Sequence, residues 1–258
     1  MGVHRNDRVG LEALLWDVDG TLADTEFQGH RLAFNQAFAA AGLDWRWDEA
    51  TYGQLLAISG GRERIRHFWQ HGSQRPCAQV DVEALMAAKQ AAYASLARCG
   101  TLPLRPGVGR LVREAAAWGL PQALVTTSSR SAVAALLEGQ DSAISQAFGL
   151  WICGEDVSAK KPNPEAYQLA LARLGVPPER VVALEDSPQG LAAAQAAQLP
   201  CLLTVGERPS GEPPWWRAAE ACVSHLGEAA NPSTVWQGPP CAAGQITLSW
   251  IADLLEQG

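Results

Sequence analysis

The sequence lacks paired cysteines, a surplus of basic residues and any long hydrophobic run. Its six cysteines include no Cys-x-x-Cys pair, so we interpret them as reduced residues of a cytosol-like compartment. Lysine and arginine total 20 against 27 acidic residues, a net charge of −7. This balance argues against nonspecific nucleic-acid binding, because clustered cations hold phosphate backbones. No run approaches the roughly 18 apolar residues of a membrane span, so we expect no membrane partner.

Residues 1–10 also lack the apolar core of a secretory leader. We therefore expect a cytoplasmic protein, or one of the plastid stroma if the source is a plant, and we expect a monomer. The 258 residues correspond to one large domain or two smaller ones. Hydrophobic residues make up 47% and charged residues only 18% of the chain, a composition that excludes intrinsic disorder.

Short apolar runs alternate with helical patterns along much of the chain. Such runs, bounded by turn residues, are typical of buried parallel strands, and the alternation predicts an α/β fold with a Rossmann-like parallel sheet. A short final helix is indicated around Leu248 and Ile251, but the rest of the proline- and glycine-rich tail after 207 gives no clear pattern. The predicted strands are 11–16, 121–125, 150–153, 181–184 and 201–205.

The stretch from about 25 to 98 breaks this alternation and has only helical patterns. Phe34, Ala37, Phe38 and Ala41 form one apolar stripe, and two more helices are indicated over 61–71 and 81–98. We predict a helical cap over residues 25–99, inserted into an α/β core made of residues 1–24 and 100–258.

Acidic residues follow two of the predicted strands. Asp17 and Asp19 come directly after the first strand, and Glu185-Asp186 ends another. Ligand sites of open parallel sheets lie outside the strand carboxyl ends. There, one carboxylate can attack a phosphoryl group, a second can act as general acid and base, and the remainder suit Mg²⁺. The alternatives are an ordinary Asp-Gly turn and acids that stabilise a helix N-terminus.

Two further residues fit phosphate chemistry at the same edge. Lys161 can neutralise the nucleophile and hold the transferred phosphoryl oxygens, although a solvated lysine pair is the plain alternative. Thr126 follows the strand 121–125 and can bind a phosphate at the start of the next helix, or it simply caps that helix.

These four signals, in this order, resemble the haloacid dehalogenase superfamily of phosphotransferases. The resemblance implies the fold of that superfamily, with Asp17 as nucleophile and Asp19 as general acid and base. It further implies that Mg²⁺ is held by Asp17, the backbone carbonyl of Asp19 and Asp186, with Glu185 assisting directly or through water. Thr126 and Lys161 would hold the phosphoryl group. The matching motifs are Asp17-Val-Asp19-Gly-Thr-Leu, Thr126, Lys161-Pro162 and Glu185-Asp186-Ser187.

The insertion after the first motif resembles the cap of the β-phosphoglucomutase-like subgroup, and further segments look like the CbbY family. These segments are 33–38, 42–45, 59–65 and 159–162. The resemblance implies a phosphatase for xylulose-1,5-bisphosphate, an inhibitor of Rubisco and hence linked to the Calvin cycle. The second phosphate would bind at Gly61 with Arg62 or Arg64, although family members more often have lysine at position 62. We assign Glu26 and His30, one helical turn apart, to the substrate hydroxyls; the alternative is an ordinary polar contact between cap and core.

Three alternatives remain open at this stage. A sugar-phosphate mutase uses the same nucleophile and acid/base, and a phosphatase for phosphoglycolate has the same motifs. A non-enzymatic phospho-accepting module also places an aspartate at a sheet end, but it does not need Asp19 and is usually shorter. True haloacid dehalogenases lack the second aspartate, so Asp19 also argues against dehalogenation.

Overall fold

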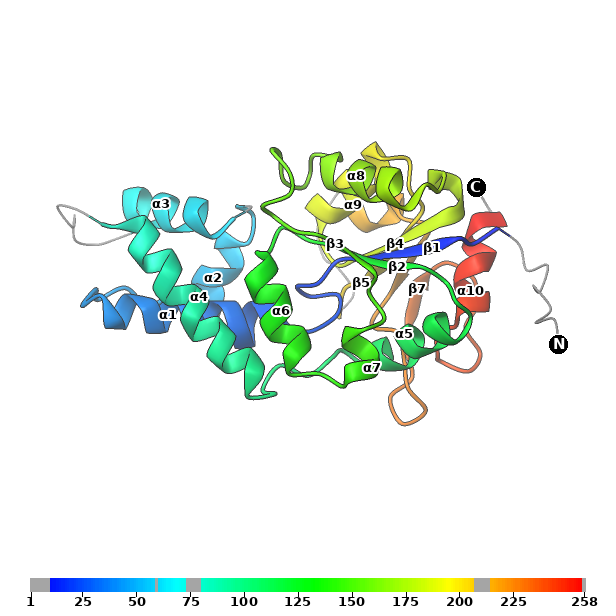
Figure 1. The fold of residues 1–258 in the computed structure, drawn as a ribbon, viewed down its shortest axis with the longest axis horizontal. Helices are drawn as coiled ribbons and strands as arrows, with labels where there is room; N and C mark the ends of the chain where they lie inside the picture. The colour runs from blue at the N-terminus through cyan, green and yellow to red at the C-terminus, as the bar shows by residue number, and fades with distance from the viewer. Residues whose placement is uncertain (1–9, 59, 73–79, 207–213, 257–258) are drawn as a thin grey trace.

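The computed structural model describes residues 10–58, 60–72, 80–206 and 214–256. Within this part of the chain the strands form one seven-stranded sheet in the order β3-β2-β1-β4-β5-β6-β7 (Figure 1). All neighbours are parallel except β6 and β7, which confirms the predicted α/β class. The strands are β1 (Ala13–Trp16), β2 (Gln122–Val125), β3 (Leu150–Ile152), β4 (Val181–Glu185), β5 (Cys201–Thr204), β6 (Ala221–Val223) and β7 (Val235–Gln237).

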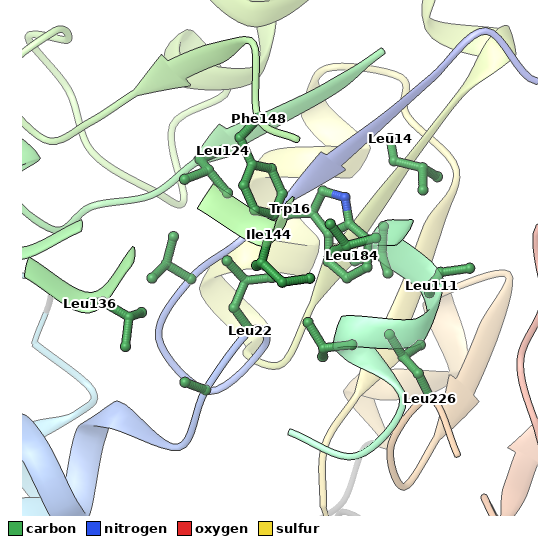
Figure 2. Packing of buried hydrophobic residues seen from close by; sticks show 14 of the residues in the cluster. Leu14, Trp16, Leu22, Leu111, Leu124, Leu136, Ile144, Phe148, Leu184 and Leu226 are labelled. Carbon is green, nitrogen blue, oxygen red and sulfur yellow. The ribbon is translucent and has the colours of Figure 1, made fainter. Parts of the chain in front are cut away.

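Strand β1 lies in the sheet interior between β2 and β4. All four of its residues are buried, because successive side chains enter hydrophobic clusters on opposite faces. Leu14 and Trp16 belong to one cluster, and Ala13 and Leu15 to the other. Figure 2 shows Trp16 packed among side chains from distant segments. Its ring is edge-on to that of Phe148, with 6.4 Å between the ring centroids. The burial on both faces fixes the position of the residues that follow β1.

Helices cover both faces of the sheet, with α8 and α9 on one side and α5, α7 and α10 on the other (Figure 1). Serine side chains cap two of them: Ser129 accepts from the N–H of Ala132, and Ser187 from that of Gly190. These helices are α5 (Val108–Ala117), α6 (Arg130–Glu138), α7 (Ser142–Ser145), α8 (Glu165–Leu174), α9 (Pro188–Ala196) and α10 (Leu248–Ala252), with 3-10 turns at Pro178–Arg180, Trp215–Ala218 and Asp253–Glu256.

In the described part of the chain between β1 and α5, four α-helices and one π-helical turn share their own aromatic core. Phe34, Phe38, Trp47 and Tyr52 are buried together there. The segments that lead into and out of these helices are paired by an isolated antiparallel β-bridge between Ala23 and Leu104. The helical insertion is therefore present, while the proposed boundaries at 24/25 and 99/100 stay a prediction. Its helices are a π-helical turn (Glu26–His30), α1 (Arg31–Ala40), α2 (Glu49–Leu55), α3 (Gly61–His71) and α4 (Val82–Arg98).

The tail contains structure that its sequence did not reveal. Strands β6 and β7 extend the sheet, and the final helix ends at Ala252 before a 3-10 turn. Five described cysteines are free, whereas Cys77 and residues 1–9, which bear on the leader prediction, lie outside the described residues. None of the described helices is both long and apolar enough to cross a membrane.

Candidate active site

The predicted acids and Lys161 meet at the carboxyl ends of β1, β2 and β4. The Lys161 ammonium donates to Asp17 Oδ1 at 2.7 Å, to Glu185 Oε1 at 2.6 Å and to the carbonyl of Val125 at 2.6 Å. All three charged side chains are buried. Burial alone would lower the pKa of Lys161, but the carboxylates of Asp17 and Glu185 outweigh it and raise that pKa. The lysine therefore stays charged beside Asp17.

Asp17, Glu185 and Asp186 form a cluster whose ligand oxygens lie within 4.8 Å of one another. Burial, together with repulsion between the carboxylates, raises the pKa of Asp17 and of Asp186. With all three acids ionised, they and the Lys161 ammonium leave two negative charges in the cluster. Glu185 Oε2 is buried with no hydrogen-bond partner among the described residues. A divalent cation with oxygen ligands would compensate that charge, so the residues fit a metal site.

Tyr167 orients Glu185 and was missed by the sequence analysis. Its hydroxyl donates to Glu185 Oε1 at 2.5 Å, and its ring lies 5.0 Å from the Lys161 ammonium. Burial, followed by the charge of Glu185, raises the pKa of Tyr167, which keeps the phenol a donor. Because Oε1 already accepts from both Lys161 and Tyr167, Oε2 is the oxygen left for a cation.

Gly20 makes the close approach of Asp186 possible. Its φ is 86°, and a β-carbon there would overlap the Asp186 carboxylate. We expect Gly20→Ala to displace Asp186 and to weaken binding of a divalent cation at least tenfold, measured by calorimetric titration with MgCl₂. Gly42→Ala is the matched control, because Gly42 has a φ of 70° and nothing within 4 Å of its β-carbon position. Equal cation affinity in the two variants would contradict this explanation.

The Asp19 carboxylate is not part of the acid cluster and accepts three hydrogen bonds. Thr25 and Ser128 donate their hydroxyls to it, and His30 Nε2 lies 2.9 Å from Oδ1. Burial raises the pKa of Asp19, but His30 and these hydrogen bonds outweigh it, and the pKa lies below its usual value. Asp19 is therefore an ionised carboxylate in this arrangement, and any metal contact of its backbone carbonyl stays a prediction.

A buried lysine extends this contact into the helical insertion. Lys89 Nζ lies 2.8 Å from His30 Nδ1. Since an ammonium only donates, Nδ1 accepts and Nε2 carries the proton toward Asp19. Burial lowers the pKa of Lys89 to about 8. The sequence could have indicated that Lys89 is buried, because it lies on the apolar stripe of α4 that contains Leu85, Met86 and Tyr93.

We expect Lys89→Met to lower kcat/KM by about 10- to 100-fold, because it breaks the hydrogen-bonded chain from Lys89 through His30 to Asp19. The unfolding free energy at pH 7 should not fall, because burial disfavours the charged ammonium. Urea denaturation and phosphate-release kinetics measure the two effects. Arg98→Gln, at the exposed end of the same helix, is the control. A loss of stability with unchanged activity would show a purely structural role.

The loop after β2 supplies Ser128 in addition to the predicted Thr126. Thr126 is buried, and its hydroxyl oxygen accepts from the backbone N–H of Ser128 at 3.1 Å. Ser128 reaches Asp19, whereas Thr127 lines the cavities beside it. Thr126 thus shapes the loop, and a direct contact of its hydroxyl with phosphate stays a prediction.

Two adjoining cavities open on these residues. One, of about 400 Å³, contains Asp17, Lys161 and Asp186; the other, of about 320 Å³, lies toward α3 and α4 and contains His30 and Lys89. We call them the catalytic cavity and the cap cavity. Asp19, Glu26, Arg64 and Thr127 line both, so one extended ligand can occupy the two together.

Glu26 and Arg64 are fixed at the junction by Tyr52, a buried residue that the sequence analysis did not select. The Tyr52 hydroxyl donates to Glu26 Oε2 at 2.5 Å and accepts from Arg64 Nη1 at 3.0 Å. Gly61 and Arg62 also line the cap cavity, but Arg62 Nε donates to Glu83 at 2.8 Å. The predicted residues for the second phosphate are thus close together, with both arginines already hydrogen-bonded.

Arg105 connects the first catalytic loop to the far end of the sheet. It follows the Ala23–Leu104 bridge, and its buried guanidinium donates to the carbonyl oxygens of Gly20, Thr204 and Ser224. The carbonyl of Ser224, 2.8 Å from Nη2, belongs to the tail. Arg105 therefore links the turn that carries Asp19 to β5 and to the segment after β6.

Comparisons with known proteins agree with this geometry. The family model for haloacid dehalogenase-like hydrolases matches residues 11–198. Protein CbbY of Cupriavidus necator is 40% identical over 227 residues, covering 86% of this chain and 88% of that protein. Protein CbbY of Cereibacter sphaeroides is 44% identical over 197 residues, covering 76% and 85%.

Solved structures give the same result. CbbY from Rhodobacter sphaeroides in complex with phosphate has a TM-score of 0.77 at 41% identity and covers 84% of this chain and 96% of its own. A mutant of that CbbY, in complex with xylulose-1,5-bisphosphate, has a TM-score of 0.75 at 39% identity and covers 85% and 96%. The sheet, the acids at its carboxyl edge and these matches together show that the chain belongs to the haloacid dehalogenase-like hydrolases, in the CbbY group.

Proposed function

We propose that this enzyme is a Mg²⁺-dependent phosphatase that converts xylulose-1,5-bisphosphate to xylulose-5-phosphate through an aspartyl-phosphate on Asp17. The observation that carries the proposal is the buried Asp17 carboxylate, 2.7 Å from the Lys161 ammonium and open to the catalytic cavity. The choice of sugar rests on the similarity to the CbbY whose structure contains that bisphosphate.

In the proposed reaction, an oxygen of Asp17 attacks the phosphorus while the bond from phosphorus to the sugar oxygen breaks. Lys161, the residue 2.7 Å away, neutralises charge on the phosphoryl oxygens. When bound by Asp17, Asp186, Glu185 and the carbonyl of Asp19, Mg²⁺ would supply further charge compensation at the same oxygens. Thr126 and its loop would hold the phosphoryl group. Water then cleaves the aspartyl-phosphate and returns Asp17 to its carboxylate form.

Asp19 transfers a proton in each of the two steps. Although its pKa is low in this arrangement, an arriving phosphate dianion raises the pKa of a nearby carboxylate. Asp19 can therefore carry a proton into the complex, give it to the departing sugar oxygen and then accept one from the attacking water. His30, at 2.9 Å, holds the carboxylate in place, and Glu26 with His30 would contact the sugar hydroxyls.

A phosphate-release assay with and without EDTA tests this function. We expect release from xylulose-1,5-bisphosphate that requires Mg²⁺, less from phosphoglycolate, and no isomerised product from glucose-1-phosphate. Faster release from phosphoglycolate would reassign the substrate, and isomerised sugar phosphate without free phosphate would identify a mutase. Full activity in EDTA would contradict the proposed metal requirement.

A further inference from the structure

The cap cavity lies where the second phosphate of a bisphosphate would arrive. It shares Asp19, Glu26 and Arg64 with the catalytic cavity, so a sugar whose first phosphate sits at Asp17 can extend into it. A phosphate there is best held by a cation whose donors are not already engaged by other protein groups. The cations of this cavity can be compared on that criterion.

Four lysines and arginines line the cap cavity: Arg62, Arg64, Lys89 and Lys160. Arg62 forms an ion pair with Glu83 at 2.8 Å. Arg64 donates a hydrogen bond to the Tyr52 hydroxyl and lies 3.5 Å from the Glu26 carboxylate. The Lys89 ammonium contacts His30 Nδ1. The Lys160 ammonium makes no hydrogen bond or ion pair with any described residue, although the backbone carbonyl of Lys160 accepts from the N–H of Asn163 at 3.0 Å. Within the part of the chain that the structure describes, it is thus the one of these four cations whose side-chain donors are all available.

Lys160 also faces the helical insertion from the core. Its Nζ lies 3.2 Å from the position that a β-carbon on Gly60 would take, at the start of α3. The next residue, Lys161, lines the catalytic cavity instead. Two consecutive lysines therefore serve two adjoining cavities, and one bisphosphate can contact both.

Acids near Lys160 limit which ligands fit. Glu63 reaches back over Gly60, and Glu155 lines the cavity while accepting from the backbone N–H of Arg130 at 3.1 Å. A neutral or singly charged sugar end gains little from Lys160 beside these acids, whereas a phosphate dianion gains a charge-assisted hydrogen bond. Without Lys160, the same acids would repel the dianion.

We propose that Lys160 is the residue that selects substrates carrying a second phosphate, by donating to it across the cap cavity. The inference rests on the proposed phosphatase function and deepens it. Lys160 acts in binding at a distance from the bond that breaks, so its contribution belongs in KM and leaves the chemical step alone.

The test compares Lys160→Gln with wild type on xylulose-1,5-bisphosphate and on p-nitrophenyl phosphate, which has one phosphate. We expect the KM for the bisphosphate to rise about tenfold more than that for p-nitrophenyl phosphate, with kcat changed less than threefold. Lys160→Arg should restore most of the affinity because it keeps the charge. Arg66→Gln, an exposed change on α3 outside the cavity, controls for the lost positive charge.

The other possible results contradict either the role of Lys160 or the proposed substrate. An equal loss on both substrates, or no loss on the bisphosphate, overturns the role of Lys160 while the phosphatase function stands. A selective loss in Arg62→Gln instead of Lys160→Gln assigns the second phosphate to Arg62. If wild-type enzyme releases no phosphate from the bisphosphate, the proposed substrate and this inference fall together.

Discussion

Replacing Asp17 with asparagine should lower the turnover of phosphate release by about 10⁴-fold or more, as removal of a covalent nucleophile does. The amide keeps the shape of the side chain but cannot form the aspartyl-phosphate. It also removes one of the two carboxylates that hold Lys161. Steady-state phosphate release measures the effect, and trapping of labelled phosphoryl enzyme by acid quench in wild type but not in Asp17→Asn identifies the bond that is lost.

Asp253→Asn is the control, because Asp253 is exposed in the last 3-10 turn and far along the chain from the cavities. It should retain wild-type activity. Contaminating phosphatase must first be excluded. If Asp17→Asn then releases phosphate in a Mg²⁺-dependent way at more than one hundredth of the wild-type rate, Asp17 is not the nucleophile.

Replacing Asp19 with asparagine should lower sugar phosphate turnover by about 10²- to 10⁴-fold, the usual range for a lost general acid and base. The effect should depend on the leaving group. A sugar alkoxide needs a proton as it departs, whereas p-nitrophenolate is a weak base and does not. We therefore expect Asp19→Asn to release a first equivalent of p-nitrophenol in a burst and then to stall, because water lacks its base.

Rapid-mixing absorbance measurements follow this burst. Equal slowing of the first turnover for p-nitrophenyl phosphate and for the sugar phosphate would indicate that Asp19 only shapes the site. Thermal denaturation of the variant controls for the loss of the hydrogen bonds from Thr25, His30 and Ser128.

The sequence was most informative where local pattern alone determines structure. The core strands appear within about two residues of their predicted positions, since a fully buried strand such as Val181–Glu185 needs a continuous apolar run. Strands β6 and β7 have only three residues each and are defined by pairing with neighbours. A three-residue run in a proline-rich tail has too little periodicity to be recognised.

The same reasoning explains which site residues were found. Asp17 directly follows one strand and Glu185 ends another, so their convergence follows from parallel topology. Asp19 lies two residues after Asp17 and lines both cavities. Lys89 and Tyr52 reach the site only because helices of the insertion fold over the core edge, and Tyr167 because α8 packs beneath Lys161. The contacts Lys89–His30 and Tyr52–Glu26 join residues 59 and 26 positions apart. Helical periodicity places such residues on a helix face but does not identify the side chains that they contact.

The contacts of Arg105 determine how short a working version of this protein can be. Its guanidinium takes carbonyl partners from the loop at Gly20 and from Ser224, about 200 positions apart in the sequence. A fragment that stopped after the family match at residue 198 would keep every acid proposed for catalysis. It would also leave this guanidinium without its acceptors at Thr204 and Ser224. The smallest active fragment therefore includes β5 and β6, although these strands contain none of the catalytic motifs. Truncations and fusions of the enzyme should leave both strands intact.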